Sequence, residues 1–290
     1  MAEDSDAAAP QSGSTPAEEP AQNLAGGLRA TGLRVSAIAL VGVTWLSAGL
    51  FGLYILAYYG GTASDGALER WNDTLQGLYE ANAPLATLGI GSHFLGGGVL
   101  LLLGPIQLIP WVRERSIAVH RWLGRLFVTA AAIAAVGGLT FTLLSGTIGG
   151  AVMDAGFGLY GSLMLLTAVQ TVRYARARQF DAHRAWGIRL FALVVGSWLY
   201  RIEYGLWFSA FGEAGHTDSF NGAFDYFMAF AFYLPNLAVA ELFIRARRRA
   251  GPLTEVLAIG VLSATTALLV VGTYFFTREF WGPEIARRFL

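Results

Sequence analysis

Long apolar stretches separated by short polar loops constrain this chain more than any other feature. A stretch of roughly 20 apolar residues is long enough for one helical crossing of a bilayer. We find about seven, at residues 34–59, 84–110, 124–147, 152–172, 186–209, 224–244 and 254–276. Only 14% of the residues are charged, against about 25% in soluble domains. The sequence therefore predicts an all-α, polytopic integral membrane protein.

The charges between these stretches predict how the chain is threaded. Arginines gather in every second loop, at residues 112–125, 173–189 and 245–251, whereas the alternate loops are mainly acidic. Arginine-rich loops stay on the cytoplasmic side of a membrane. We therefore expect a multi-pass protein of the cell inner membrane with its N-terminus in the cytoplasm and its C-terminus outside. The arginine loops would contact anionic lipid head groups; we expect no nucleic-acid partner.

Composition divides the chain into four parts. Residues 1–30 are polar, acidic and without apolar period, which is typical of a disordered cytoplasmic tail. Residues 31–83 would hold the first membrane helix and an outer loop, and residues 84–245 a core membrane domain of four to five helices. Residues 246–290 would add a last membrane helix and a short outer tail. The absence of cysteine excludes disulfides, iron–sulfur clusters and cysteine nucleophiles.

Part of the core domain is duplicated. Four residues recur about 63 positions later: Gln107, His120, Arg121 and Gly124 become Gln170, His183, Arg184 and Gly187. Each copy forms a hairpin, in which an inward-going helix ends in glutamine, a basic loop follows, and His-Arg opens the returning helix. Two tandem hairpins predict a core bundle of four helices.

The duplicated histidines are candidate cofactor ligands. His120 and His183 would begin two helices at the same depth near the cytoplasmic face, and imidazoles from two helices can bind a metal ion or the iron of a haem. The candidate cofactor-binding residues of the repeat are His120, His183, Arg121, Arg184, Gln107 and Gln170. The arginines could pair with propionates or phosphates. The alternative is interfacial anchoring, in which these side chains only lie among lipid head groups.

A third histidine, His93, lies deeper, roughly 13 Å from the outer end of the second stretch. It shares a helix face with glycines, which leave room for a flat ligand or for a closely packed helix. We count His93 with His120 and His183 as a candidate metal ligand, against the alternative that it hydrogen-bonds a neighbouring helix.

Two charges in the fifth stretch also need partners, because buried charges in a membrane must be paired or hydrated. Arg201 and Glu203 are two residues apart, so they point to different sides of the helix. We expect Asp154 or Asp225 to pair with Arg201.

Four segments resemble the bacterial family of predicted membrane proteins called domain of unknown function 2306, over about residues 85–245. They are His93, Gly-Pro-Ile-Gln at 104–107, His-Arg-Trp-Leu-Gly-Arg at 120–125 and His-Arg-Ala-Trp-Gly-Ile-Arg at 183–189. The resemblance implies a polytopic inner-membrane protein and draws attention to the three histidines, but it implies no activity. A looser likeness to four-helix b-type cytochromes of the b561 kind departs from their pattern. Those cytochromes place histidine pairs inside the bundle on both sides of the membrane.

Three functions remain open. The first is membrane redox chemistry with haem b or a divalent metal on His120 and His183, and with His93 as a further ligand or proton relay. The second is transport of a small molecule or an ion along a path lined by His93, Arg201 and Glu203. The third is a non-enzymatic scaffold or assembly factor whose arginine loops bind lipid or a partner. Hydrolase motifs of the Gly-x-Ser-x-Gly and His-Glu-x-x-His types are absent.

Overall fold

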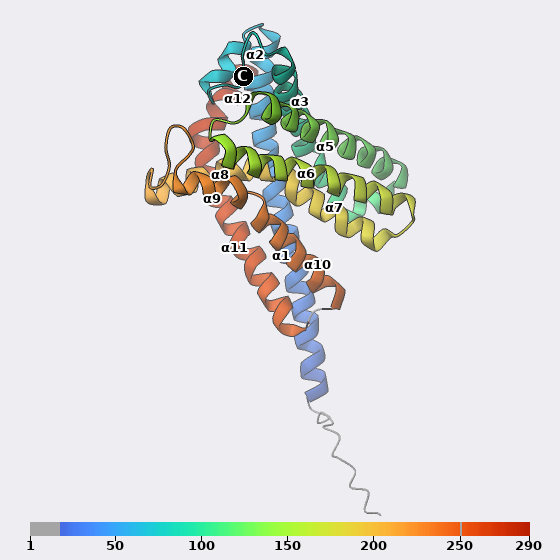
Figure 1. The fold of residues 1–290 in the computed structure, drawn as a ribbon. Helices are drawn as coiled ribbons and strands as arrows, with labels where there is room; N and C mark the ends of the chain where they lie inside the picture. Colours follow the sequence, from blue (N-terminus) through green and yellow to red (C-terminus); the bar gives the residue numbers. More distant parts are fainter. Residues whose placement is uncertain (1–17, 250) are drawn as a thin grey trace, which may run out of the picture.

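The computed structural model describes residues 18–249 and 251–290, and every secondary-structure element within these ranges is helical (Figure 1). Six helical segments of the described chain are long and apolar enough to cross a membrane. The expected stretch that is absent from these six is the fifth, which contains the charged residues Arg189, Arg201 and Glu203. The all-α fold class is confirmed, and the count of about seven membrane helices is consistent with it.

Helix α1 (Glu18–Ile55) begins earlier than composition predicts. Residues 18–30 are helical rather than disordered, and the remainder of the expected tail, residues 1–17, lies outside the described residues. This segment is rich in alanine and leucine, which are good helix formers. This propensity favours extension of the membrane helix into the polar segment.

Helix α11 (Pro252–Phe276) lies beside α1 and runs parallel to it (Figure 1). Near one end, Arg29 pairs with Glu255, with 3.0 Å between Nε and Oε2. Near the other end, the Thr273 hydroxyl donates to Ser47 Oγ over 2.6 Å. Both helices therefore cross in the same direction, as the first and last of an odd number of crossings do.

Four helices form the core: α3 (Pro84–Leu103), α5 (Ile117–Ser145), α6 (Gly150–Arg176) and α7 (Phe180–Val194). Each contacts the next and α7 contacts α3, so α5 and α7 occupy opposite corners. Glycines allow α3 and α5 to approach closely, since a Cβ on Gly89 would lie 2.8 Å from the Gly137 carbonyl oxygen. This is the four-helix core that the tandem hairpins predict.

The single helix expected over residues 186–209 is replaced by α7 and α8 (Gly196–Phe211), which meet at Val195. The Tyr160 hydroxyl, on α6, donates to the Leu193 carbonyl oxygen over 2.7 Å. That oxygen would otherwise accept from the N–H four residues on, and such an insertion bends or breaks a helix. The interruption coincides with this bond from a side chain on another helix and with the adjacent pair Gly196–Ser197, a local pattern that also favours a kink.

The sixth stretch is also divided, into α9 (Ala223–Ala231) and α10 (Leu234–Arg249). Pro235 has no N–H to donate, so the helical ladder is interrupted just before it. The missing N–H would have bonded the Ala231 carbonyl oxygen, and beside it the Asn236 side-chain amide donates to the carbonyl oxygen of Phe232 over 2.7 Å. Side-chain bonding of this kind is how interrupted membrane helices keep their backbone groups satisfied.

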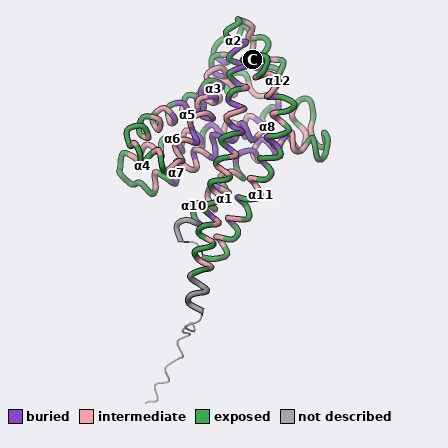
Figure 2. Tube along the Cα trace, turned by 180° about the vertical axis from the view of Figure 1, so that it is seen from behind, coloured by how far each residue is buried: buried purple, intermediate pink, exposed green. Residues whose placement is uncertain are grey.

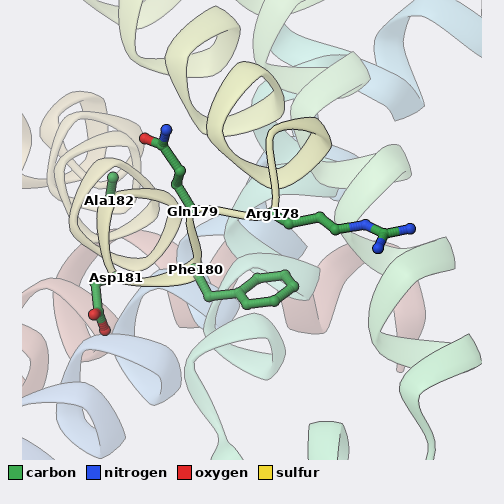
Figure 3. A pocket seen from close by; sticks show the side chains of 5 residues that line it. All are labelled: Arg178, Gln179, Phe180, Asp181 and Ala182. Carbon is green, nitrogen blue, oxygen red and sulfur yellow. The ribbon is translucent and has the colours of Figure 1, made fainter.

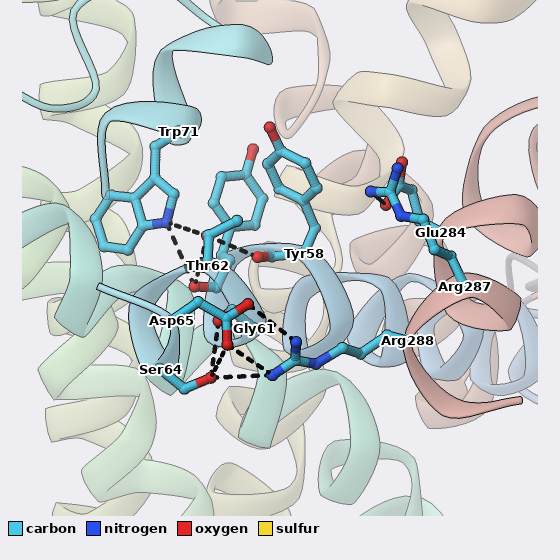
Figure 4. A network of polar contacts seen from close by, with 10 residues as sticks. Tyr58, Gly61, Thr62, Ser64, Asp65, Trp71, Glu284, Arg287 and Arg288 are labelled. Atoms are coloured by element: carbon cyan, nitrogen blue, oxygen red, sulfur yellow. Dashed lines mark hydrogen bonds and ion pairs between the residues drawn. The ribbon is translucent and has the colours of Figure 1, made fainter. Parts of the chain in front are cut away.

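The chain folds into a cap at the end of α1 opposite to its N-terminus, where the C-terminus also lies (Figure 1). The cap contains α2 (Gly61–Ser64), a 3₁₀ turn at Leu68–Asp73 and the C-terminal helix α12 (Gly282–Phe289). Figure 4 shows the contacts between them: Trp71 Nε1 donates to Thr62 Oγ1 over 2.9 Å, and Arg288 Nη1 lies 3.0 Å from Asp65 Oδ2. The tail after α11 is thus bound to the segment that follows α1.

Burial differs from one part of the molecule to another. Buried residues gather where α8 and the upper part of α1 meet the bundle, whereas the lower parts of α1 and α11 are mainly exposed or half-buried (Figure 2). Large apolar side chains lie on the outside, with Leu143 82% and Leu253 72% exposed. Such a surface suits a surrounding medium of lipid rather than water.

Candidate functional site

The first copy of the repeat brings Gln107 against His120. Gln107 lies in the 3₁₀ turn Gly104–Leu108, and His120 lies in the first turn of α5, where the Ser116 hydroxyl caps the helix by accepting from the Val119 N–H. With its amide oriented to suit all three neighbours, Gln107 donates to His120 Nδ1 over 3.2 Å and to the His120 carbonyl oxygen over 3.3 Å. Its oxygen accepts from the Gly124 N–H over 3.3 Å. Nδ1 then accepts a bond, so the ring proton of neutral His120 resides on Nε2.

The second copy holds its histidine differently. His183, in the first turn of α7, has Nδ1 2.9 Å from the Thr171 carbonyl oxygen on α6. A carbonyl oxygen only accepts, so Nδ1 carries the proton and Nε2 keeps a free lone pair. Gln170, the counterpart of Gln107, has a buried Oε1 without a hydrogen-bond partner in the described residues. Of the two imidazoles, only that of His183 has the protonation pattern of a ligand.

The two rings belong to the same end of the bundle. Both lie in the first turn of helices that begin at that end, although α5 and α7 stand at opposite corners. Arg121 and Arg184 follow them in sequence and are exposed. The bundle thus has His120 and His183 at one end, with an arginine after each in the sequence.

The loop between the two helices of the second hairpin has a hollow that is open to its surroundings. It is lined by Arg178, Gln179, Phe180, Asp181 and Ala182, and the side chains diverge rather than converge (Figure 3). Arg178 adopts a left-handed backbone conformation, with φ of 57°, which turns the chain sharply between α6 and α7. This hollow offers a ligand no converging polar groups.

His93 is separate from the histidine pair. Its Nδ1 lies 2.9 Å from the Ala134 carbonyl oxygen on α5, and Gly96 packs so closely on α5 that a Cβ would lie 3.0 Å from the Ala130 carbonyl oxygen. The glycine face of α3 therefore admits a neighbouring helix. Among the described residues, no three His, Asp or Glu side chains are placed to hold a metal ion together, so His93 does not join His120 and His183 in one site.

The prediction that Asp154 or Asp225 pairs with Arg201 is wrong. Asp154 accepts from the Thr147 N–H over 2.7 Å, and Asp225 accepts from the Thr217 and Gly222 N–H groups over 3.1 and 2.9 Å. Both carboxylates are thus used to satisfy backbone groups at turns. Arg201 instead donates to the carbonyl oxygen of Ser197 over 3.0 Å, and its guanidinium carbon lies 4.9 Å from the centre of the Phe51 ring.

Glu203 has a buried Oε2 without a hydrogen-bond partner in the part of the chain that the structure describes. It therefore does not pair with Arg201.

The sequence did not predict a buried polar network that joins the second half of α8 to the start of α9. Asp225 is fully buried, and its Oδ1 accepts from the Tyr204 hydroxyl over 2.8 Å and lies 2.7 Å from His216 Nδ1. Tyr200 donates to the Tyr204 hydroxyl over 3.2 Å. The sequence signal for this network is Asp225 itself, an aspartate in the first turn of α9. Its hydrogen-bond partners come from a loop and from α8, so their position relative to Asp225 cannot be read from the sequence.

Comparison with known proteins gives one match. The model of a family described as "Predicted membrane protein (DUF2306)" matches residues 90–244, which is just over half of the 290 residues. The matched range includes both copies of the repeat and His93. No curated protein and no solved structure matches the chain.

Proposed function

The chain belongs to the family of predicted membrane proteins described as domain of unknown function 2306, and on that premise we propose that it binds haem through His120 and His183 and takes part in membrane redox chemistry. The observation that supports the proposal is that two imidazoles, on helices at opposite corners of a four-helix bundle, both lie in the first turn of their helix at the same end of that bundle. Facing helices of such bundles are where cofactor sites are built.

The donor set favours haem over a bare metal ion. Two imidazoles are the full axial set of a haem iron but only half of the four ligands of a tetrahedral metal site. His183 fits this role directly, because Thr171 fixes its proton on Nδ1. His120 fits once the Gln107 amide turns over, so that Oε1 accepts from Nδ1–H and Nε2 carries the lone pair. The turn loses two bonds, one from the Gln107 amide to the His120 carbonyl oxygen and one from the Gly124 N–H to Gln107 Oε1.

The neighbouring residues have defined tasks. A bound haem would supply one-electron transfer. Arg121 and Arg184 would neutralise its propionates, while Thr171 and Gln107 orient the imidazoles, as hydrogen-bond partners of metal-bound histidines do. A Cβ on Gly187 would meet nothing within 4 Å, so the second copy leaves open space beside its histidine.

Absorption spectra and iron analysis of detergent-purified protein from haem-replete cells test the proposal. We expect a Soret band that His183→Ala abolishes. His93→Ala is the matched control, because His93 is a histidine outside the pair, and the band should survive it. Colourless, iron-free wild-type protein would refute the proposal, and so would a band that His183→Ala leaves intact.

The placement in the cell is part of the same proposal. We infer a cytoplasmic N-terminus, an outside C-terminus and arginine loops at the anionic head groups of the inner membrane, supported by the alternation of loop charge and by the parallel α1 and α11. Because the chain lacks cysteine, single cysteines report topology directly. An impermeant maleimide should label Asp218→Cys in intact spheroplasts and Ala177→Cys only after lysis; the reverse pattern would invert the topology.

Transport is the second candidate, and the two interrupted stretches favour it. Discontinuous helices often build transporter sites near the middle of the membrane, and α7 and α8 meet within one turn of Ser197, near His93 and Arg201. A transporter should expose Gly97→Cys to impermeant reagents from each side of the membrane in turn. Labelling from one side only would count against transport.

A further inference from the structure

A small cavity lies between α1, α3 and α8, away from the histidine pair. Its lining includes Phe51 and Tyr59 from the α1 segment, His93 and Gly97 from α3, and Ser197 and Arg201 from α8. It offers about 20 Å³ to a water-sized sphere. At 1.5 Å per residue, Arg201 stands roughly 15 Å inside the outer end of α8, and His93 roughly 13 Å inside that of α3.

Arg201 brings a permanent positive charge to this depth. A guanidinium is not deprotonated in proteins, so its charge must be balanced or hydrated within the membrane. Among the described residues, no carboxylate lies within 4.0 Å of Arg201, and its single hydrogen bond is to the Ser197 carbonyl oxygen. The Phe51 ring, 4.9 Å away, offers only a partial counter-charge.

We propose that this cavity binds a small monovalent anion of the size of chloride, which balances Arg201. A volume of about 20 Å³ holds one water molecule or one monatomic ion, and it excludes phosphate, sulfate and carboxylate groups. Most of the guanidinium N–H groups remain to donate to such an ion.

The surrounding rings suit an anion as well. Tyr59 and Phe94 stack with their centres 4.1 Å apart, so each covers a face of the other. Both rings line the cavity, and the edge of an aromatic ring is positively polarised. The Tyr59 hydroxyl is engaged with Thr74 Oγ1 over 2.9 Å, and the described lining contains no acidic side chain to repel the ion. The inference requires neither a cofactor on the histidine pair nor transport.

Line broadening of the ³⁵Cl resonance by purified protein tests this site. The measurement is made in sodium sulfate of constant ionic strength, because sulfate competes for exposed arginines but does not fit the cavity. We expect the wild type to broaden the line and bromide to reverse the effect. No broadening, or broadening that extra sulfate removes as readily as bromide does, would overturn the proposal.

Variants locate the ion. Arg201→Gln should lose most of the broadening, while Arg278→Gln, an exposed arginine near the chain end, should retain it. Gly97→Leu keeps the charge but fills the cavity, and it should also lose the broadening. If Arg201→Gln does not fold, Gly97→Leu and the bromide competition still decide. Retained broadening in a folded Gly97→Leu protein contradicts the assignment.

Discussion

In the second hairpin a backbone carbonyl holds the histidine, whereas in the first a side-chain amide takes that place. Thr171 can only accept, so His183 has one protonation pattern. The Gln107 side-chain amide can donate or accept, so His120 has two possible protonation patterns. The amide orientation that suits all the neighbours of Gln107 places the ring proton of His120 on Nε2. Matched residues in a repeat thus do not guarantee matched contacts. The second histidine is prepared as a ligand, and the first becomes one only when an amide turns.

The largest expected difference between the copies comes from removing each histidine. His183→Ala should abolish haem binding, because it removes the prepared ligand. His120→Ala should leave weaker binding through His183 alone. The ratio of haem to protein after purification measures both. Equal loss in the two variants would show that the hairpins are equivalent after all.

The next effect concerns the glutamines. Gln107→Glu replaces an amide by a carboxylate that only accepts, so it should fix the proton of His120 on Nδ1 and tighten haem binding by about tenfold, the lower end for partners of metal-bound histidines. Gln170→Met, the matched change in the second copy, removes a buried oxygen without a partner in the described residues and should leave binding unchanged. Haem titration of the apoprotein compares them. A weaker Gln107→Glu variant would contradict the assigned role of the amide.

The ion pair between the second hairpin and α10 predicts that mutations affecting the two hairpins differ in their effect on stability. Arg189 donates to Glu241 over 2.6 Å, and Arg245 bonds the same carboxylate over 3.0 Å. Glu241→Gln should destabilise the fold by about 1 kcal/mol, the upper range for partly exposed pairs. Arg125→Gln in the first hairpin should cost less, because Arg125 has no ion pair in the described chain. Thermal unfolding in detergent distinguishes the two, and equal shifts would remove the contrast.

The smallest effect comes from the glycines four residues after each histidine. Gly187→Ala should stabilise α7 by about 0.5–1 kcal/mol, because its Cβ would meet nothing and alanine is the better helix former. Gly124→Ala should gain less, since its Cβ would lie 3.3 Å from the Gln107 amide. Unfolding of the haem-free proteins measures both. A larger gain at Gly124 would mean that Gln107 is not held against α5.

The sequence predicts the membrane helices well, because apolar length and loop charge act locally. Hydropathy predicts the five helices α1, α3, α5, α6 and α11. For most of these helices' ends, the predicted position is within a few residues of the observed one. Hydropathy did not mark the interruption at Val195, where the Tyr160 hydroxyl of another helix bonds the Leu193 carbonyl oxygen and the pair Gly196–Ser197 follows. It also missed the helical residues 18–30, where propensity outweighs polar composition.

For the site, spacing was enough to bring His120 and His183 to one end of the bundle. Spacing could not identify the hydrogen-bond partners of these histidines. The partner of His183 is the backbone carbonyl of Thr171, and a residue of any type at that position would have such a carbonyl. Pairing by charge failed for Arg201, since Asp154 and Asp225 are drawn to unsatisfied N–H groups at turns. The partner that a buried carboxylate takes depends on which unsatisfied N–H group lies nearest to it. Only the folded chain reveals that group.

Electron paramagnetic resonance of the oxidised, purified protein tests the shared histidine site most directly. Two imidazoles on one ferric haem give a low-spin signal, and we predict that signal in the wild type and its conversion to a high-spin signal in His120→Ala. A wild-type protein without a haem signal, or a low-spin signal that persists when His183 is replaced by alanine, would contradict the account.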